Sequence, residues 1–213
     1  NMLEAVALNA NRKNGDLKLY EFGNCYFYDA DKRSDENPLA AYSEEYRLAI
    51  AVSGVAVPQS WNVKPEKASF FTLRAVAEKL LRRFGVDIYA LRCESVASDL
   101  FGEALALSLG NKELLRIGTV AGRIRRMLDV KQEVYYLEMN FDALVKSTRK
   151  HRIAAEELSK FPEVKRDLAL LVDKQTTFSA LRDVAFATER KLLKSVARFD
   201  VYEGDKLPEG KKS

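Results

Sequence analysis

The residue types that most often perform catalysis are scarce in this sequence. His151 is the only histidine, and it stands between Lys150 and Arg152 in a polar stretch, where a solvated side chain is its usual role. Cys25 and Cys93 are the only cysteines, too few and too far apart for a CxxC metal site or a disulfide framework. We therefore expect no Ser-His-Asp or Cys-His site and interpret both cysteines as free, mostly buried thiols.

Sequence patterns that hold nucleotide phosphates or pair two acids are also missing. There is no P-loop, and no G-x-G-x-x-G follows an expected strand. The acidic pairs Glu44-Glu45 and Glu156-Glu157 are adjacent in sequence, so their side chains diverge on either a strand or a helix. The sequence predicts no catalytic residue, cofactor site or metal site in this chain.

Positively charged side chains are the remaining candidates for a binding site. Arg123, Arg125 and Arg126 could hold a phosphate or an acidic partner surface, and a solvated turn is the simpler alternative. Beyond residue 160 several lysines and arginines occur near Phe199 and Tyr202, a composition typical of RNA-binding proteins. Any RNA contact must come from such local patches, because 35 basic and 31 acidic residues give the chain a net charge of only +4.

Length and hydropathy limit the architecture that carries these residues. At 213 residues with 47% hydrophobic residues, the chain can bury one full core and part of another. No apolar run approaches the roughly 20 residues that cross a bilayer, and the first residues do not resemble an export signal. We expect a cytoplasmic, soluble protein with one complete domain and a smaller second part.

Residues 1–150 alternate between strand-like runs and one clear helix. Ser69 is the expected N-cap of that helix, apolar residues follow at spacings of three and four, and Gly85 ends it. Strands in quick succession around it favour an antiparallel sheet, with residues 29–38 as a loop between the first two and residues 122–129 as a separator. The expected strands span residues 17–28, 46–55, 94–96, 104–109, 114–120 and 134–140.

A polar linker, residues 151–160, separates this part from residues 161–213. The second part contains an apolar strand at 168–173, an amphipathic helix at 178–193 and another strand at 196–202. This order is β-α-β. The fold class predicted for the whole chain is therefore α+β, an antiparallel sheet with helices followed by an incomplete α+β domain.

Several stretches resemble phenylalanyl-tRNA synthetase beta chains. Phe161–Asp173, which reads FPEVKRDLALLVD, and Phe199–Gly204, which reads FDVYEG, together with Gly210–Ser213, which reads GKKS, are similar to the ferredoxin-like anticodon-binding domain that ends those chains. Upstream matches occur in the order found in the catalytic-like core module of the same family. They are Asn11-Arg12, Leu19–Asn24, Ser53-Gly54, Trp61, Phe70–Arg74 and Tyr136–Glu138.

The resemblance implies a class II synthetase-like core at residues 1–150 that has lost its chemistry. Neither the Phe-Arg-x-Glu motif nor the glycine-rich segment ending in arginine, with which class II enzymes hold ATP, is present. The chain itself should be inactive, and ATP and magnesium would be used by the parent α2β2 ligase. Its implied partners are the alpha subunit of that complex and tRNA.

In residues 161–213 the resemblance implies a docking site for tRNA. Phosphate contacts are expected from four cations and stacking from one aromatic ring: Lys165, Arg166, Lys211, Lys212 and Tyr202. Arg166 has an equal alternative role as the ion-pair partner of Asp167 or Asp200.

Two departures and one alternative accompany the resemblance. The family's Gly-x-x-His-Pro reads Gly118–Gly122, GTVAG, here, and a Pro-Gly segment is replaced around Ser98–Gly102. If residues 161–213 form only the first half of a ferredoxin-like domain, the first and second strands should leave a gap where the third belongs, with unpaired edges available to another chain. We then expect disorder, a swapped contact or irregular packing at residues 161–213. The alternative is a stand-alone RNA- or protein-interaction module with no ligase role.

Overall fold

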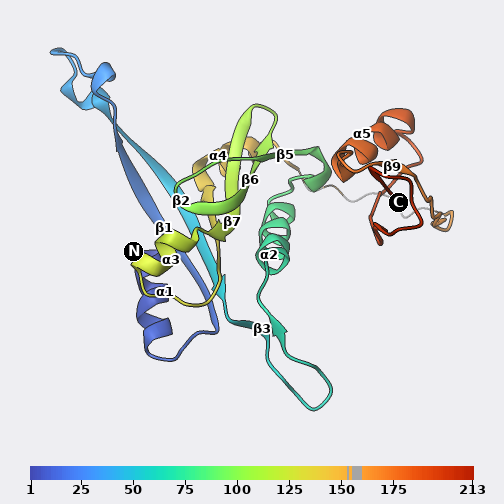
Figure 1. Cartoon of the computed structure of the whole chain (residues 1–213). Coiled ribbons are helices and arrows are strands. Elements are labelled where there is room, and N and C mark those ends of the chain that lie inside the picture. The colour runs from blue at the N-terminus through green and yellow to red at the C-terminus, as the bar shows by residue number, and fades with distance from the viewer. Residues whose placement is uncertain (153, 155–159) are drawn as a thin grey trace. The chain divides into compact units, whose positions relative to one another are not determined.

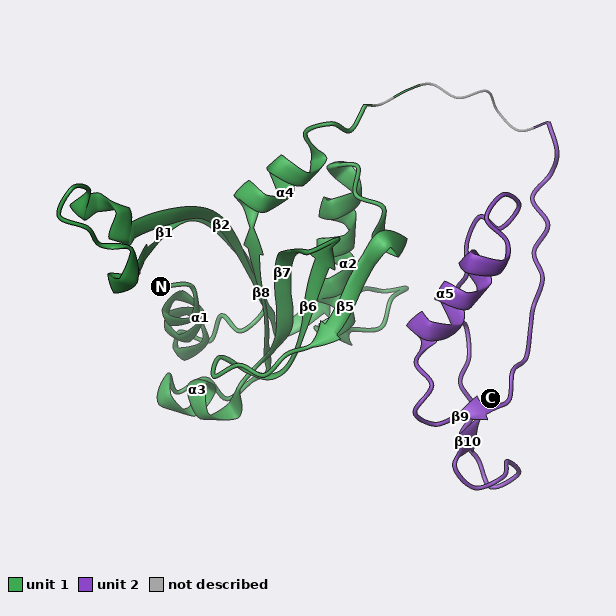
Figure 2. Ribbon diagram, turned by 90° about the horizontal axis from the view of Figure 1, so that it is seen from above, with its two compact units in different colours: residues 1–154 green, residues 155–213 purple. Residues whose placement is uncertain are grey.

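The computed structural model describes residues 1–152, 154 and 160–213. The chain divides into two compact units, residues 1–154 and 155–213 (Figure 1, Figure 2). The linker expected at 151–160 lies largely outside the described residues, because 153 and 155–159 are not among them. No helix in the described part of the chain is both long and apolar enough to cross a membrane.

A six-stranded antiparallel sheet forms the centre of unit 1, in the order β1-β2-β8-β7-β6-β5. This arrangement confirms the predicted α+β class with an antiparallel sheet. The strands are β1 (Leu17–Tyr28), β2 (Tyr42–Ser53), β5 (Leu91–Ser95), β6 (Phe101–Leu109), β7 (Lys112–Val120) and β8 (Val134–Asn140).

Helices cover both faces of this sheet (Figure 2). On one face lie α1 (Met2–Asn11) and α3 (Gly122–Met127), whose apolar side chains join a buried cluster that includes Val6, Leu17 and Val120. On the other face lie α2 (Phe70–Arg83) and α4 (Phe141–Thr148), which contribute Leu81 and Leu144 to the larger cluster. Unit 1 therefore has three layers and two cores.

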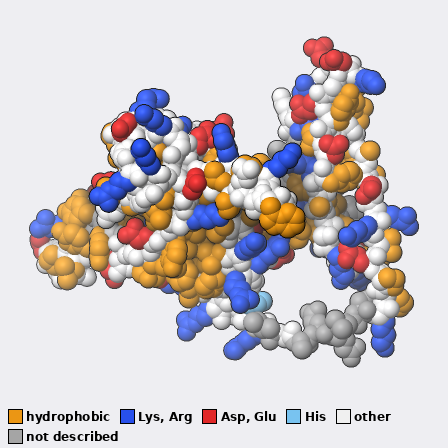
Figure 3. Space-filling model, turned by 90° about the horizontal axis from the view of Figure 1, so that it is seen from below, with side chains coloured by type: hydrophobic (Ala, Val, Ile, Leu, Met, Phe, Trp, Pro, Cys, Tyr) orange, Lys and Arg blue, Asp and Glu red, His pale blue; other side chains and the backbone are white. Residues whose placement is uncertain are grey.

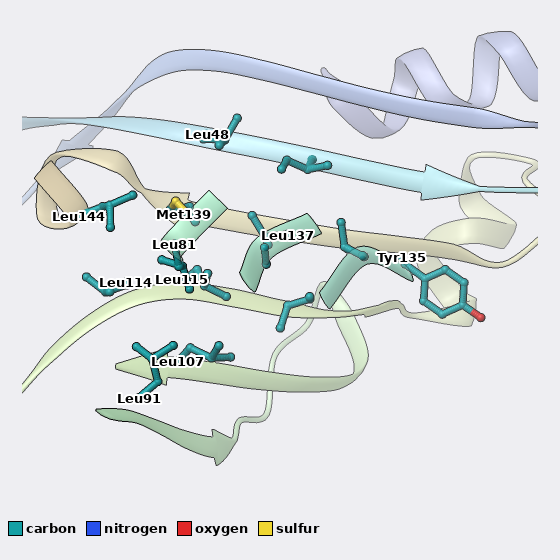
Figure 4. Close-up of a cluster of buried hydrophobic side chains, with 14 of the residues drawn as sticks. Leu48, Leu81, Leu91, Leu107, Leu114, Leu115, Tyr135, Leu137, Met139 and Leu144 are labelled. Atoms are coloured by element: carbon teal, nitrogen blue, oxygen red, sulfur yellow. The ribbon is translucent and has the colours of Figure 1, made fainter. Parts of the chain in front are cut away.

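The alternation of side chains along β8 explains why both cores depend on one strand. Successive side chains of a strand point to opposite faces. Tyr135, Leu137 and Met139 accordingly enter the larger core on the α2 side, and Val134 and Tyr136 enter the core on the α1 side. Figure 4 shows Leu137 and Met139 among the buried leucines of the larger core.

Helix α2 begins and ends at the predicted residues. The Ser69 hydroxyl accepts a hydrogen bond from the Thr72 amide at 3.3 Å, and the Thr72 hydroxyl accepts one from the Ser69 amide at 3.1 Å, which forms a capping box. Gly85 follows the helix with a φ of +80°, a conformation that glycine adopts most easily. Local sequence signals therefore define this helix at both ends.

The connections of unit 1 contain more structure than the sequence predicted. The segment expected as a loop after β1 holds two short turns of 3-10 helix, η1 (Ala30–Lys32) and η2 (Pro38–Ala41), and η3 (Ile88–Ala90) precedes β5. The separator expected at 122–129 is largely helix α3. A small hairpin of β3 (Val55–Val57) and β4 (Glu66–Lys67) carries Trp61, whose side chain is 96% exposed.

The cysteine expectation was only half right. Both cysteines are free thiols, as predicted. Cys93, however, is exposed rather than buried. It lies on β5, an edge strand whose residues after Leu91 are exposed to solvent.

Unit 2 contains less regular structure than predicted. Its described elements are β9 (Val172–Asp173), α5 (Phe178–Thr188) and β10 (Lys211–Lys212). The strand expected at 168–173 is limited to its last two residues, and no strand is assigned at 196–202. Strand ladders require a paired neighbour, and most of both segments is exposed without one.

Helix α5 ends five residues earlier than the predicted residue 193. Glu189 caps it in an extended conformation, and its carboxylate accepts hydrogen bonds from the amides of Lys191 and Leu192 at 2.7 and 2.9 Å. These bonds lower the pKa of Glu189, because they stabilise its charged form. The local turn competes with continuation of the helix.

The gap predicted between the two strands of unit 2 is partly filled by the last residues of the chain. β10 pairs with β9 in antiparallel register, Lys211 opposite Asp173. On the other side, the backbone of Ser213 exchanges two hydrogen bonds with that of Tyr202, at 2.7 and 3.0 Å. Residues 211–213 thus lie where the third strand of a ferredoxin-like fold belongs, between the first and the second.

Candidate nucleic-acid interface

Lys165 and Arg166 are freely available to a ligand. Both are exposed, in a stretch without assigned helix or strand. Among the described residues neither forms an ion pair, so the alternative pairing of Arg166 with Asp167 or Asp200 is not present in this structure. The Asp200 carboxylate instead accepts a hydrogen bond from the amide of Val201. Two adjacent solvated cations can approach a phosphate at little cost in broken contacts.

Lys211 and Lys212 are held more firmly, by the pairing of β10 with β9. The ammonium group of Lys211 lies 2.7 Å from a carboxylate oxygen of Asp173, and that of Lys212 donates to the carbonyl of Lys174 at 2.7 Å. Both side chains are half-buried. The charge of Lys211 is therefore compensated, whereas Lys212 has no carboxylate partner among the described residues, and Lys212 is the better placed of the two to attract a phosphate.

Tyr202 is partly exposed and packs against its own chain. Its side chain is 46% exposed. A Cβ placed on Gly204 would come within 2.3 Å of the Tyr202 hydroxyl and 2.4 Å of the adjacent ring carbon, so the ring lies against the bare backbone of that glycine. Glycine at 204 therefore allows the ring to adopt this position, and much of the ring remains accessible for stacking.

A polar concavity of about 570 Å³ opens beside the lysine pair. It is lined by the turn after β9 and by the glycine before β10, namely Asp173, Lys174, Gln175, Thr176 and Gly210. Lys174 was not among the predicted residues, although the turn composition of this segment could have indicated it. The concavity brings backbone and side-chain polar groups next to Lys212, and it contains one carboxylate, that of Asp173, already paired with Lys211.

The arginine cluster of unit 1 offers less to an anion than its sequence suggested. Arg123 forms an ion pair with Asp99 at 2.6 Å, and Arg125 donates to the carbonyl of Gln132 at 2.9 Å. Arg126 alone has no such contact among the described residues. A concavity of about 370 Å³ beside these residues also contains the carboxylate of Asp129. Most of the cluster is therefore engaged within the fold.

The side chains that most often bind metal ions do not cluster in the described part of the chain. The described residues contain no group of three or more His, Cys, Asp and Glu side chains that could hold a metal ion. His151 is exposed, and its imidazole lies against the backbone of Gly85.

Comparison with protein families finds two models that match this chain in succession. A model described as the phenylalanyl tRNA synthetase beta chain CLM domain matches residues 1–141. A model described as the ferredoxin-fold anticodon binding domain matches residues 159–213. The second match contains all five residues that were predicted to contact RNA.

Curated relatives show the same similarity over the whole chain. The chain is 46% identical over 212 residues to the phenylalanine--tRNA ligase beta subunit of Bacteroides thetaiotaomicron and 42% identical over 212 residues to that of Porphyromonas gingivalis. In both cases 99% of this chain and 26% of the relative are covered, so the chain spans about a quarter of their length. Among solved structures, a pyrrolysyl-tRNA synthetase of Desulfitobacterium hafniense matches 70% of this chain and 48% of its own, with 14% identity and a TM-score of 0.48.

Proposed function

This chain belongs to the phenylalanyl-tRNA synthetase beta chain family, and from that premise we propose that it is a structural and tRNA-docking region of a phenylalanine-tRNA ligase. The observation that carries the proposal is the order of the two family matches, a catalytic-like module at residues 1–141 and an anticodon-binding domain at 159–213. The region supports attachment of phenylalanine to its tRNA without performing the chemistry.

We assign a separate role to each of the two units. Residues 1–150 form a catalytically inactive core module that packs on the alpha subunit of a cytoplasmic α2β2 complex, and residues 151–160 link it to the anticodon-binding part, residues 161–213. ATP and magnesium are used by the complex rather than by this chain. Its sequence supports this assignment, because it lacks the arginine-bearing motifs with which class II enzymes hold ATP.

In unit 2 the proposed tRNA contacts divide into two kinds. Lys165, Arg166 and Lys212 neutralise phosphates, and Lys211 does so after exchanging its partner Asp173 for a phosphate. Phosphate contacts fix the position of the RNA, and base contacts confer preference. Tyr202 supplies a ring for stacking, an interaction worth about 1–3 kcal/mol per base.

Binding of a fluorescent tRNA-Phe transcript to the 213-residue chain tests this proposal. The double variant Lys165→Gln, Arg166→Gln should weaken binding about tenfold, as expected for the loss of two phosphate contacts. The matched control Arg190→Gln, Lys206→Gln removes the same charge from the same unit and should change affinity less than threefold. Equal losses in both variants, or none in either, would contradict the assignment.

A second pair of variants isolates the stacking contact. Tyr202→Ala should weaken binding about fivefold to a hundredfold, the equivalent of one stacked base. Tyr202→Phe keeps the ring and should bind like the wild type. If Tyr202→Ala binds the tRNA with the same affinity as Tyr202→Phe, the ring does not stack on the RNA.

A further inference from the structure

Unit 1 carries a second concentration of positive charge, outside the arginine cluster described above. It gathers where α2 and α4 end. Its six members are all exposed, and none was among the predicted RNA contacts: Arg82, Arg83, Lys146, Arg149, Lys150 and Arg152. We call this set the helix-end surface.

Contact between Gly85 and His151 joins the two halves of the helix-end surface. A Cβ placed on Gly85 would meet three atoms of the His151 imidazole at 2.2–2.5 Å. The residues that follow α4 therefore lie directly against the turn that ends α2, although more than sixty positions separate them in sequence. Figure 3 shows Lys and Arg side chains gathered around the single histidine on this face.

The described residues provide no carboxylate partners for the cations of the helix-end surface. None of the six forms an ion pair with a carboxylate among the described residues. Elsewhere in unit 1 arginines do find acidic partners, for example Arg92 with Glu94 and Arg116 with Glu113. The carboxylate nearest in sequence to the end of α2, that of Asp87, accepts a hydrogen bond from the amide of Tyr89.

Helix dipoles account for only part of this charge. A helix C-terminus carries roughly half a negative charge, which favours one or two nearby cations. Two helix ends therefore offset about one of the six positive charges. Even with the carboxylate of Asp87 counted, an excess of about four positive charges remains among the described residues, and stabilisation of the helices does not require it.

We propose that the helix-end surface binds the phosphate backbone of RNA, as a second tRNA contact of this chain. The inference rests on the proposed function, which gives the chain an RNA partner, and it adds a site on unit 1. Arginine presents several donors that match phosphate geometry, and a group of exposed cations without carboxylate partners among the described residues suits a phosphodiester chain.

Salt dependence of tRNA-Phe binding by the 213-residue chain tests the inference. Each phosphate contact contributes about 0.7–0.9 to the slope of log affinity against log salt concentration. The variant Arg82→Gln, Arg83→Gln, Arg149→Gln, Arg152→Gln should reduce that slope by about 3 and weaken binding at least tenfold at about 50 mM salt. Glutamine keeps helix propensity close to that of arginine.

A matched control removes the same charge from ion-paired positions. It carries Lys32→Gln, Arg92→Gln, Arg116→Gln and Arg123→Gln and should change affinity less than threefold. Should the fourfold variant unfold, the pair Arg149→Gln, Arg152→Gln lies outside the helix interiors and should reduce the slope by about 1.5. An unchanged slope, or equal losses in variant and control, would overturn the inference.

Two further outcomes separate this inference from the proposed function. Loss of binding in the Lys165→Gln, Arg166→Gln variant but not in the helix-end variant would leave the proposed function standing and overturn the second site. Loss only in the helix-end variant would support the second site and contradict the assignment of Lys165 and Arg166 as phosphate contacts. Poly-L-glutamate should compete far less effectively than RNA at equal charge concentration, and equal competition would indicate an acidic protein partner instead.

Discussion

Replacing Leu137 with alanine tests whether the larger core of unit 1 is packed as the structure shows. Leu137 is fully buried on β8, a strand hydrogen-bonded to neighbours on both sides. It lies opposite Ile50 of β2 and Ile117 of β7, both buried in the same core. Its side chain has no exposed surface and its strand is fixed on both sides, so the surrounding side chains have little room to collapse into the space left by the leucine.

The expected loss of stability follows from this enclosure. Buried leucine-to-alanine changes cost about 2–5 kcal/mol, and poorly collapsing sites lie in the upper half of that range. We expect about 4 kcal/mol for Leu137→Ala. For a unit of this size, 1 kcal/mol shifts the melting temperature by about 2–4 °C, so the transition should move down by about 8–16 °C.

Urea denaturation followed by circular dichroism measures this loss as a shift of midpoint. Leu39→Ala provides the matched control, because Leu39 is 74% exposed, and it should change stability by less than about 0.5 kcal/mol. The slope of free energy against urea should remain unchanged in both variants. A loss below about 1 kcal/mol for Leu137→Ala, or equal losses in the two variants, would refute the packing described for β8.

Three smaller predictions concern single contacts. Ser69→Ala removes the cap of α2 and should lower the free energy of unfolding by about 1 kcal/mol in the same urea assay. Ser69→Asp keeps a capping oxygen and should retain most of this stabilisation. Gly118→Ala should cost about 1–3 kcal/mol, because the new Cβ would lie 2.2 Å from the carbonyl oxygen of Glu103; a neutral result would place that strand pair further apart. Burial raises the pKa of Tyr136, so the folded chain keeps this proton after the unfolded chain loses it near pH 10. The free energy of unfolding should therefore fall as the pH rises from about 10. The Tyr136→Phe variant should lose less of its stability between pH 8 and 11 than the wild type does.

Local signals explain which elements of unit 1 were predictable. The predicted bounds 17–28 and 134–140 coincide with β1 and β8. β8 alternates between the two cores, whereas β1 is an edge strand that pairs with β2 along its whole length and contributes only Leu17 and Leu19 to one core. Ser69 and Gly85 mark α2 through capping and a positive φ, which are properties of a few neighbouring residues. Helix α3 was missed, since a helix of six residues is too short for a periodic pattern.

Unit 2 shows why other elements could not be predicted. An apolar run such as 168–173 becomes a strand only where a partner is present to pair with it, and pairing is a property of the fold rather than of the run. Likewise, Lys211 was predicted as a phosphate contact without knowledge that Asp173 would lie 2.7 Å away. Its role in RNA binding stays a prediction.

The helix-end surface could not be predicted from the sequence for a related reason. Arg82 and Arg83 belong to the end of one helix, and His151 was interpreted as a solvated side chain in a polar stretch. Only the packing of His151 on Gly85 brings the two segments together. Charge that is spread over distant segments can be recognised as one surface only after folding.

Capture of a phenylalanyl-tRNA synthetase alpha chain by this chain tests the central claim most directly. The tagged 213-residue chain would be co-expressed with the alpha chain of the same organism and purified, beside a full-length beta subunit as the positive control. The account predicts that the alpha chain co-purifies with the tagged chain in near-equal amount. Absence of the alpha chain, under conditions in which the full-length beta subunit retains it, would contradict the proposal that this region packs on the alpha subunit.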